Sequence, residues 1–476
     1  MRNKLNIRKI FGFSIGPLGG AVLGFLTLPI TAWFFSSEDI GRIALLQIVI
    51  GFTTVLFSLG LDQAYVREYH EKENKSKLWK QVVLPGFCLL AFFCIILQFE
   101  PNFISNILFQ TKSILISLLV IIIIVSNYLI RFFSLILRMQ EKGLLFSISQ
   151  IFPRLLNIIF LLSFVIFFNK NTFIYLLYAQ VFSSLATCIF FAWNTSREWL
   201  DFFNINIKVS EIYPLLKFGM PLVIGGLAYW GLNSIDRLFI VRFSNLTELA
   251  IYSIAISFAG VAIIVQSIFS TVWAPTVYKW VKNNENLDKI HDITWCLVIV
   301  IVFIVSCVGF FSFLINLLLP LQYHAVQYIV IPGLIAPLLY TLSETTVIGI
   351  GISRKSYLSL YASFGAFISA IIFNFLLVPK LGALGASISS SLSFLIFFIL
   401  RTELSVLAWK SFPRKKVYYV IISLIILADS NALFQERYNI FFKLIWFSLI
   451  IVSSIGLWKI YLSIRNVQEI SKNVDS

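Results

Sequence analysis

The chain has 476 residues, of which 59% are hydrophobic and only 12% are charged. Soluble globular proteins have about 45–50% apolar and about 25% charged residues. This composition therefore excludes a soluble enzyme, a secreted disulfide scaffold and a disordered protein. The 37 basic residues outnumber the 22 acidic ones, giving a formal net charge of +15. That excess could reflect nucleic-acid binding, attraction to acidic lipid or membrane topology, and the positions of the charges decide among the three.

Stretches of mostly apolar residues recur along the whole chain, and about 20 such residues suffice to cross the hydrocarbon core of a bilayer. The chain is therefore expected to be an all-α, polytopic membrane protein with about 14 transmembrane helices. The run 417–434 is the weakest candidate, because Asp429, Ser430 and Asn431 interrupt it. In chain order the predicted spans are 10–34, 42–65, 81–98, 113–137, 144–168, 172–194, 214–240, 249–276, 293–319, 326–350, 356–378, 382–403, 417–434 and 439–463.

Lysine and arginine alternate between dense and sparse loops along this series of spans. They gather in the N-terminal segment, in every second loop after it and in the C-terminal tail. The positive-inside rule then puts both termini in the cytoplasm. Most of the basic excess therefore records topology, and there is no basic stripe that would indicate nucleic-acid binding. The loops are short, and we expect interfacial helices at 195–213 and 277–292.

The first twelve predicted spans contain a weak internal repeat. Lys9-Ile-Phe-Gly12 corresponds to Lys217-Phe-Gly219, and further matches follow at a similar offset of about 208 residues. Two copies of six spans enter the membrane from the same side, as in transporters built from parallel repeats. The predicted organisation is two pseudo-symmetric six-helix lobes around a central cavity, with two appended helices. The corresponding ranges are 1–203, 204–405 and 406–476.

Polar side chains at helical spacing mark one face of two spans in the first lobe. Asn127 and Arg131 share a stripe in the fourth span, while Gln150, Arg154 and Asn157 share one in the fifth. Arg154 is about 15 Å into its span at 1.5 Å per residue, deeper than a guanidinium can fully snorkel. These five residues are the candidates for a cationic cavity that binds an anionic substrate. The alternative for Arg154 is a structural ion pair with a carboxylate of another helix.

Other ionisable residues within the spans are also candidates, because a charge inside the bilayer is costly. Asp62 and Glu344 are candidates for coupling transport to an ion gradient, although Asp62 could instead cap the membrane interface. Asn233, Asp236 and Arg237 are gate candidates, with a structural anchor as the equal alternative. Histidine and cysteine are too scattered to form a metal site, no GxxxxGK loop is present to bind ATP, and no catalytic residue or cofactor is expected.

Several motifs resemble the polysaccharide-export branch of the multidrug/oligosaccharidyl-lipid/polysaccharide (MOP) transporter superfamily, over residues 1 to about 405. They are SEDIG at 37–41, LLKFGMPL at 215–222, NSIDR at 233–237, AIYS at 250–253 and LVPKLG at 377–382. The resemblance implies a MATE-like arrangement of two lobes, sometimes with two further helices. It also implies a Wzx-type flippase that moves an undecaprenyl-diphosphate-linked oligosaccharide, such as an O-antigen unit, across a bacterial inner membrane. The implied partners are the lipid bilayer, a polysaccharide polymerase and chain-length regulator proteins.

Two other functions compete with the flippase. One is another MOP-type transporter, either a lipid II flippase or a multidrug or cation antiporter. An antiporter would favour acidic residues in the first lobe, whereas the charges in the middle of its spans are basic. The other is a membrane polysaccharide polymerase, which needs larger outside loops than this chain offers. The sequence therefore favours a transporter over an enzyme.

Overall fold

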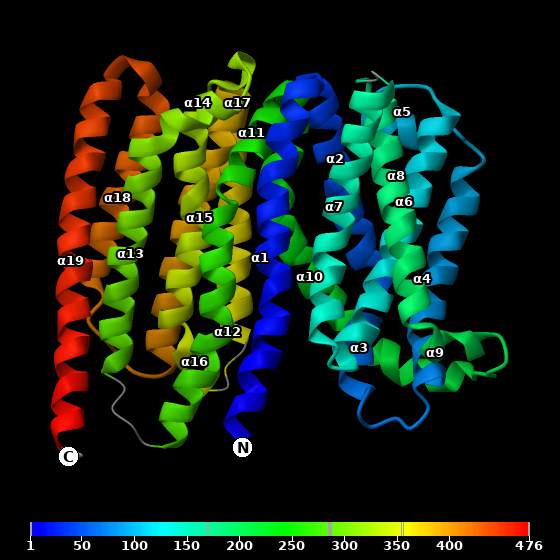
Figure 1. The fold of residues 1–476 in the computed structure, drawn as a ribbon, viewed down its shortest axis with the longest axis horizontal. Helices are drawn as coiled ribbons and strands as arrows, with labels where there is room; N and C mark the ends of the chain where they lie inside the picture. The colour runs from blue at the N-terminus through cyan, green and yellow to red at the C-terminus, as the bar shows by residue number, and fades with distance from the viewer. Residues whose placement is uncertain (1, 169–170, 284–287, 354, 356, 475–476) are drawn as a thin grey trace. The chain divides into compact units, whose positions relative to one another are not determined.

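The computed structural model describes residues 2–168, 171–283, 288–353, 355 and 357–474, and it shows α-helices and short 3-10 helices but no strand among them (Figure 1). Eleven of the described helices are long and apolar enough to cross a membrane. The prediction of an all-α, multi-pass membrane fold is therefore confirmed. The chain folds into two compact units, Met1–Ser234 and Ile235–Ser476.

Three long helices of the first unit, which start at residues 37, 75 and 114, begin after a capping side chain. Ser36, Asn74 and Ser113 each accept a hydrogen bond from the backbone N–H three residues later, which satisfies an otherwise unpaired donor of the first turn. The unit contains α1 (Arg2–Phe34), α2 (Ser37–Ser58), α3 (Leu61–Glu68), α4 (Lys75–Leu97), α5 (Phe103–Phe109), α6 (Ile114–Met139), α7 (Gly143–Phe168), α8 (Phe173–Asn194), α9 (Ser196–Trp199), η1 (Leu200–Phe202) and the first part of α10 (Val209–Phe243).

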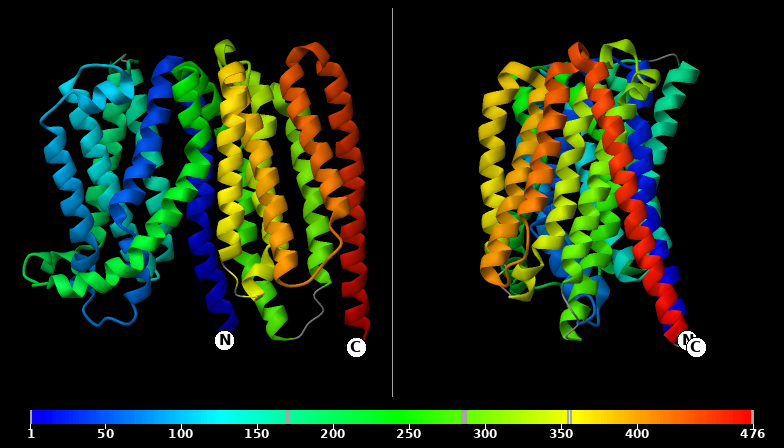
Figure 2. Two further views of the ribbon diagram at one scale, coloured as in Figure 1. Left: turned by 180° about the vertical axis from the view of Figure 1, so that it is seen from behind. Right: turned by 90° about the vertical axis from the view of Figure 1, so that its left-hand side faces the viewer.

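The second unit is built around α15, whose side chains are almost all buried. Helices α11, α12, α13, α17 and α18 pack against it, and α19 lies beside α13 (Figure 2). The unit contains the end of α10, α11 (Leu246–Phe258), α12 (Gly260–Lys282), α13 (Lys289–Phe311), η2 (Ser312–Leu314), α14 (Ile315–Leu318), η3 (Leu321–Tyr323), α15 (Val326–Thr346), α16 (Ile348–Ile352), α17 (Tyr357–Ala408), α18 (Lys415–Phe434), η4 (Gln435–Tyr438) and α19 (Asn439–Val474).

The predicted spans 356–378, from residue 357 onward, and 382–403 lie within α17, which has a kink at Gly382. This residue has φ 54° and ψ −128°, a conformation that glycine adopts far more readily than other residues. A Cβ there would lie 2.5 Å from Oε2 of Glu248, which accepts a hydrogen bond from the Ala383 N–H at 2.8 Å. The carboxylate of Glu248 thus caps the second half of α17. At Gly385 a Cβ would lie 2.5 Å from the Leu377 carbonyl, so the small side chains permit close packing here.

The other boundaries differ in part from those expected. The predicted span 249–276 is divided into α11 and α12 at Ala259, whereas α18 continues through Asp429, Ser430 and Asn431 as one helix. The region 195–213 holds α9, η1 and the start of α10, and residues 284–287 of the region 277–292 lie outside the described residues. The count of fourteen spans, the cytoplasmic termini and the division at 203/204 and 405/406 stay predictions.

Candidate functional site

Arg154 lies across a glycine-rich face of α1. Its Nη1 donates a hydrogen bond to the Gly20 carbonyl, and a Cβ at Gly24 would lie 2.7 Å from the same nitrogen. Gly16 and Gly19 bring α7 equally close, because a Cβ at these positions would lie 2.7 Å from Ser147 and 2.6 Å from Ile151. The guanidinium is thus held by a backbone carbonyl, while Arg154 as a residue is exposed on α7. This contact is not the carboxylate pair considered as the alternative.

Arg131 and Asp62, expected in separate roles, form one ion pair. Nη2 of Arg131 on α6 lies 2.7 Å from Oδ2 of Asp62, in the first turn of α3. The Arg131 side chain is 44% exposed and that of Asp62 only 9%. Gln63 donates a further hydrogen bond to the same carboxylate oxygen at 3.0 Å. Each charge therefore compensates the other, which leaves Arg154 as the stronger candidate for binding an anion.

The remaining candidates of the first unit make local contacts. Asn157 Nδ2 donates to Gln180 Oε1 at 3.0 Å and so connects α7 with α8. Asn127 Nδ2 donates to the Ile123 carbonyl of its own helix at 2.9 Å. Gln150 is half-buried on α7, one turn before Arg154. Gln150, Arg154 and Asn157 lie on one continuous helix. Asn127 and Asn157 form hydrogen bonds to other groups and not to each other.

Glu344 on α15 lies near a basic residue that the sequence assigned to topology. Arg401 of α17 is close enough for its charge to interact with that of Glu344, and its Nη1 donates to Ser343 Oγ at 2.6 Å. Its guanidinium lies 5.3 Å from the ring centre of Tyr340 and 5.0 Å from that of Phe397. Arg401 was missed because it ends a predicted span, where a basic residue normally marks the cytoplasmic side.

Asp236 is the centre of a buried polar cluster in the second unit. Its carboxylate accepts hydrogen bonds from Tyr252 Oη at 2.9 Å and from Asn374 Nδ2 at 2.7 Å, and Ser390 is a further hydroxyl neighbour. Among the described residues, Oδ1 of Asn374 is buried without a hydrogen-bond partner. Carboxylate and amide carbonyl oxygens are ligands that hard cations prefer. The sequence could have indicated Asn374, since it is a polar residue within an apolar span, but not its contact with Asp236.

The two other gate candidates lie on the same helix as Asp236 but have different surroundings. Arg237 follows Asp236 directly and is half-buried, and its charge is close enough to interact with that of Asp236. Successive side chains of a helix point about 100° apart, so the two do not face each other. Asn233 is exposed one turn earlier on α10. No group of three or more His, Cys, Asp or Glu side chains that could bind a metal occurs among the residues described.

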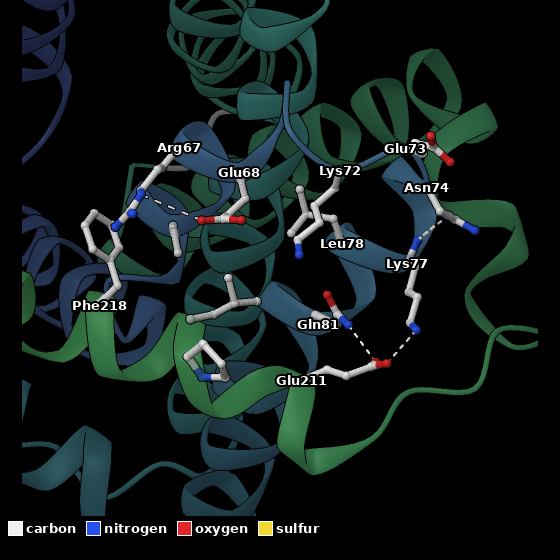
Figure 3. A pocket seen from close by; sticks show the side chains of 13 residues that line it. Arg67, Glu68, Lys72, Glu73, Asn74, Lys77, Leu78, Gln81, Glu211 and Phe218 are labelled. Atoms are coloured by element: carbon white, nitrogen blue, oxygen red, sulfur yellow. Dashed lines mark hydrogen bonds and ion pairs between the residues drawn. The ribbon is translucent and has the colours of Figure 1, made fainter.

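A separate pocket of about 390 Å³ lies in the first unit where α3, α4 and α10 meet (Figure 3). Lys77 Nζ and Gln81 Nε2 both reach Glu211, at 2.7 and 2.9 Å. On the opposite side the Arg67 guanidinium lies 4.5 Å from the ring centre of Phe218. The pocket contains none of the candidates predicted from the sequence. The contacts of Lys77 and Gln81 with Glu211 join α4 to the start of α10.

Glu198 organises a second polar cluster in the same unit. Its carboxylate accepts hydrogen bonds from Tyr65 Oη at 2.8 Å, Tyr69 Oη at 2.9 Å and Gln140 Nε2 at 2.7 Å. Burial, together with the Glu198 charge, raises the pKa of Tyr69 far above its usual range, so the phenol stays a donor at physiological pH. This cluster joins α9 to α3 and α6 and is structural.

Comparisons with known proteins agree with this architecture. The chain is similar to the structure of lipid II flippase MurJ in its inward closed conformation, with a TM-score of 0.69 and 16% identity over 94% of this chain and 99% of that chain. It is also similar to a multidrug resistance MATE family transporter of the MOP superfamily in an inward-facing conformation (TM-score 0.51, 15% identity, 86% and 96% covered). A MOP superfamily transporter from Pyrococcus furiosus matches with a TM-score of 0.50 and 15% identity, over 84% and 96%.

At these identities the similarity shows the fold, which is the MATE-like fold that the sequence motifs suggested. A comparison with curated proteins found no match. The family assignment comes from a model described as "Polysaccharide biosynthesis protein", which matches residues 7–281. Since this match covers more than half of the 476 residues, the chain belongs to the polysaccharide biosynthesis protein family and has the fold of the MOP transporter superfamily.

Proposed function

We propose that this protein is a flippase that moves an undecaprenyl-diphosphate-linked oligosaccharide, an O-antigen or other surface-polysaccharide unit, from the cytoplasmic to the outer leaflet of a bacterial inner membrane. The family assignment supports a role in polysaccharide biosynthesis. The similarity to a lipid II flippase supports a fold that can accommodate a lipid-linked substrate. A polysaccharide polymerase and a chain-length regulator would be partners, because they act on the unit once it has crossed.

The observation that carries the proposal is the position of Arg154. Arg154 belongs to an apolar helix, the residue as a whole is exposed, and its guanidinium is held from one side by the Gly20 carbonyl. A guanidinium presents several N–H donors in a planar fork that matches phosphate oxygens. Arg154 can therefore bind the diphosphate of the substrate with the donors that the carbonyl does not occupy. Gln150 and Asn157, on the same helix, are placed to add neutral hydrogen bonds.

Transport would follow from alternating access, the mechanism expected of transporters built from two repeats. The Arg154 side chain would bind the diphosphate at the cytoplasmic side, where the lipid-linked unit is made, and release it at the outer side. The polyprenyl tail would remain in the lipid, since moving it through a polar cavity would expose apolar surface to water. Only the charged and sugar-bearing part of the substrate needs the protein.

We infer that the coupling ion binds at Asp236 rather than at Asp62 or Glu344. The carboxylate of Asp62 is already paired with Arg131, and the charge of Glu344 interacts with that of Arg401 on a facing helix. The side chains that donate hydrogen bonds to Asp236 are neutral. Its charged neighbour Arg237 is the next residue of α10 and does not face it. The buried Oδ1 of Asn374 offers an additional acceptor without a partner in the described residues. This arrangement of one carboxylate with neutral oxygens fits a small monovalent cation such as Na⁺.

Substitution of Arg154 tests the proposal. We expect Arg154→Ala to lower flipping of a lipid-linked oligosaccharide in proteoliposomes by tenfold or more, and Arg154→Lys to retain part of it because the charge remains. Arg138→Ala is the matched control, since Arg138 is an exposed arginine in the last turn of α6. Undiminished flipping by Arg154→Ala at equal protein content would contradict the proposed binding site.

A further inference from the structure

The polar triplet Asp429-Ser430-Asn431 interrupts the apolar sequence of α18, a helix outside the two predicted six-helix repeats. Asn431 has a structural explanation. Its Oδ1 accepts a hydrogen bond at 2.8 Å from Nε1 of Trp446 on α19, and Trp446 is fully buried. The indole packs on Gly309 of α13, where a Cβ would lie 2.6 Å from the ring. Asn431 therefore joins α18 to α19, and this leaves Asp429 to be explained.

Asp429 is 8% exposed, and its carboxyl faces α17. Its Oδ1 and Oδ2 lie 3.0 and 3.1 Å from the Ser391 hydroxyl. Along α18 it is 14 residues from Lys415, or about 21 Å at 1.5 Å per residue. An ionised carboxylate buried at this depth with one hydroxyl partner would be strongly disfavoured, because burial in an apolar medium penalises the charged form.

No basic side chain of the described residues compensates Asp429. Helices α13, α15, α17 and α19 and the segment η4 either pack on α18 or adjoin it. No lysine or arginine nitrogen in their described parts lies within ion-pair distance of Asp429, and the Glu403 carboxylate is itself paired with Arg414 at 2.6 Å. The charged and histidine residues concerned are Lys289, His291, Asp292, Glu344, Lys380, Arg401, Glu403, Lys415, Lys416, Arg437, Lys443 and Lys459.

The hydrogen bonds of Ser391 indicate whether the Asp429 carboxyl carries a proton. Ser391 Oγ lies 2.8 Å from the Ile388 carbonyl as well as close to both Asp429 oxygens. A hydroxyl has one hydrogen to donate. If Ser391 donates it to Ile388, the contact with Asp429 is satisfied only when the carboxyl carries a hydrogen of its own and donates it to Ser391 Oγ. A neutral Asp429 satisfies both contacts, whereas an ionised one satisfies only one.

We propose that Asp429 is a proton-binding site of the appended helices. In the state described, its carboxyl holds the proton and donates it to Ser391 Oγ. Release breaks the O–H bond of Asp429 and passes the proton to water that reaches the carboxylate when α17 and α18 separate there. This site is distinct from the Asp236 cluster, but it is adjacent to it along α17, because Ser390 neighbours Asp236 and Ser391 binds Asp429. A shift of α17 would therefore alter both sites.

Infrared spectroscopy of the full chain in lipid nanodiscs tests this proposal without relying on transport. A protonated carboxyl has a C=O stretching band that an ionised one lacks, and the band shifts in heavy water. We expect the wild-type spectrum at neutral pH minus that of Asp429→Asn to contain this band. Asp62→Asn is the control that should leave the band in place, since Asp62 is ion-paired. Equal bands in wild type and Asp429→Asn would overturn the proposal.

A second variant keeps the test decisive if Asp429→Asn does not fold. Ser391→Ala retains the carboxyl and removes its hydrogen-bond acceptor, so the band should persist and move to the frequency of a free carboxyl. A folded Ser391→Ala protein whose carboxyl band is identical to that of wild type would also overturn the proposal. Because both measurements report proton occupancy, they can succeed even if the chain proves not to be a flippase.

Discussion

The guanidinium of Arg154 occupies the space that a side chain at Gly24 would need. A Cβ at residue 24 would lie 2.7 Å from Nη1, so a side chain there would require the end of the arginine to shift. We expect Gly24→Ala to displace the guanidinium and to reduce flipping of the lipid-linked substrate several-fold. Alanine favours a helix over glycine by about 0.5–1 kcal/mol, so a loss of transport need not reflect unfolding of α1. The measurement is the flipping rate in proteoliposomes.

Gly225→Ala is the matched control for this prediction. Residue 225 is a helical glycine of α10 where a Cβ would meet nothing within 4 Å. Its substitution should leave the flipping rate unchanged. If Gly24→Ala and Gly225→Ala transport equally well, the contact between Arg154 and α1 has no role in positioning the guanidinium.

The ion pair between Asp62 and Arg131 predicts that Asp62 has a structural role and does not couple transport to an ion gradient. Because the Arg131 side chain is 44% exposed, we expect a double-mutant cycle of Asp62→Asn and Arg131→Gln to give a coupling energy of about 1 kcal/mol or less. Ion-driven transport should persist in Asp62→Asn. Loss of ion dependence in that variant, with its stability intact, would instead restore Asp62 as a coupling carboxylate.

Much of the fold follows from features that are local in the sequence. Apolar runs long enough to cross a bilayer predicted the helices, and regularly spaced polar residues placed Gln150, Arg154 and Asn157 along one helix. Even the interrupted run 417–434 forms a single helix, because Asn431 and Asp429 find partners on α19 and α17. Local periodicity therefore predicted the elements well even where the residues looked unfavourable.

The contacts of the candidate site could not be predicted in the same way. Asn374 is 138 residues from Asp236 in the chain, and only the packing of α17 on α10 brings the amide to the carboxylate. Arg401 lies near the end of a predicted span, where the sequence does not distinguish a functional arginine from one that marks the cytoplasmic side. The pairing of Arg131 with Asp62 joins two residues that spacing alone had assigned to different functions. A side chain's partner depends on tertiary packing, which a single sequence does not specify.

The backbone conformation of Gly382 predicts that substitution of this glycine destabilises the protein. A non-glycine residue in its conformation costs on the order of 1–3 kcal/mol, and a Cβ would also lie 2.5 Å from the Glu248 carboxylate that caps the second half of α17. We expect Gly382→Ala to lower the thermal unfolding temperature clearly. Gly260→Ala should not lower it, since a Cβ at residue 260 meets nothing within 4 Å. Equal unfolding temperatures for the two variants would show that the kink is dispensable.

The Asp236 cluster predicts stabilisation by the coupling ion. A ligand that binds only the folded state at about 100 times its Kd stabilises that state by about 2.7 kcal/mol. Saturating Na⁺ should therefore raise the unfolding temperature of the wild-type protein above its value in choline at equal ionic strength. Asp236→Asn should abolish the difference because the carboxylate is the only charged ligand, and Asn374→Leu should weaken it by removing the amide oxygen. Asp62→Asn is the control and should respond as wild type does. A sodium response that survives Asp236→Asn would place the coupling ion elsewhere, with Glu344 the next carboxylate to substitute.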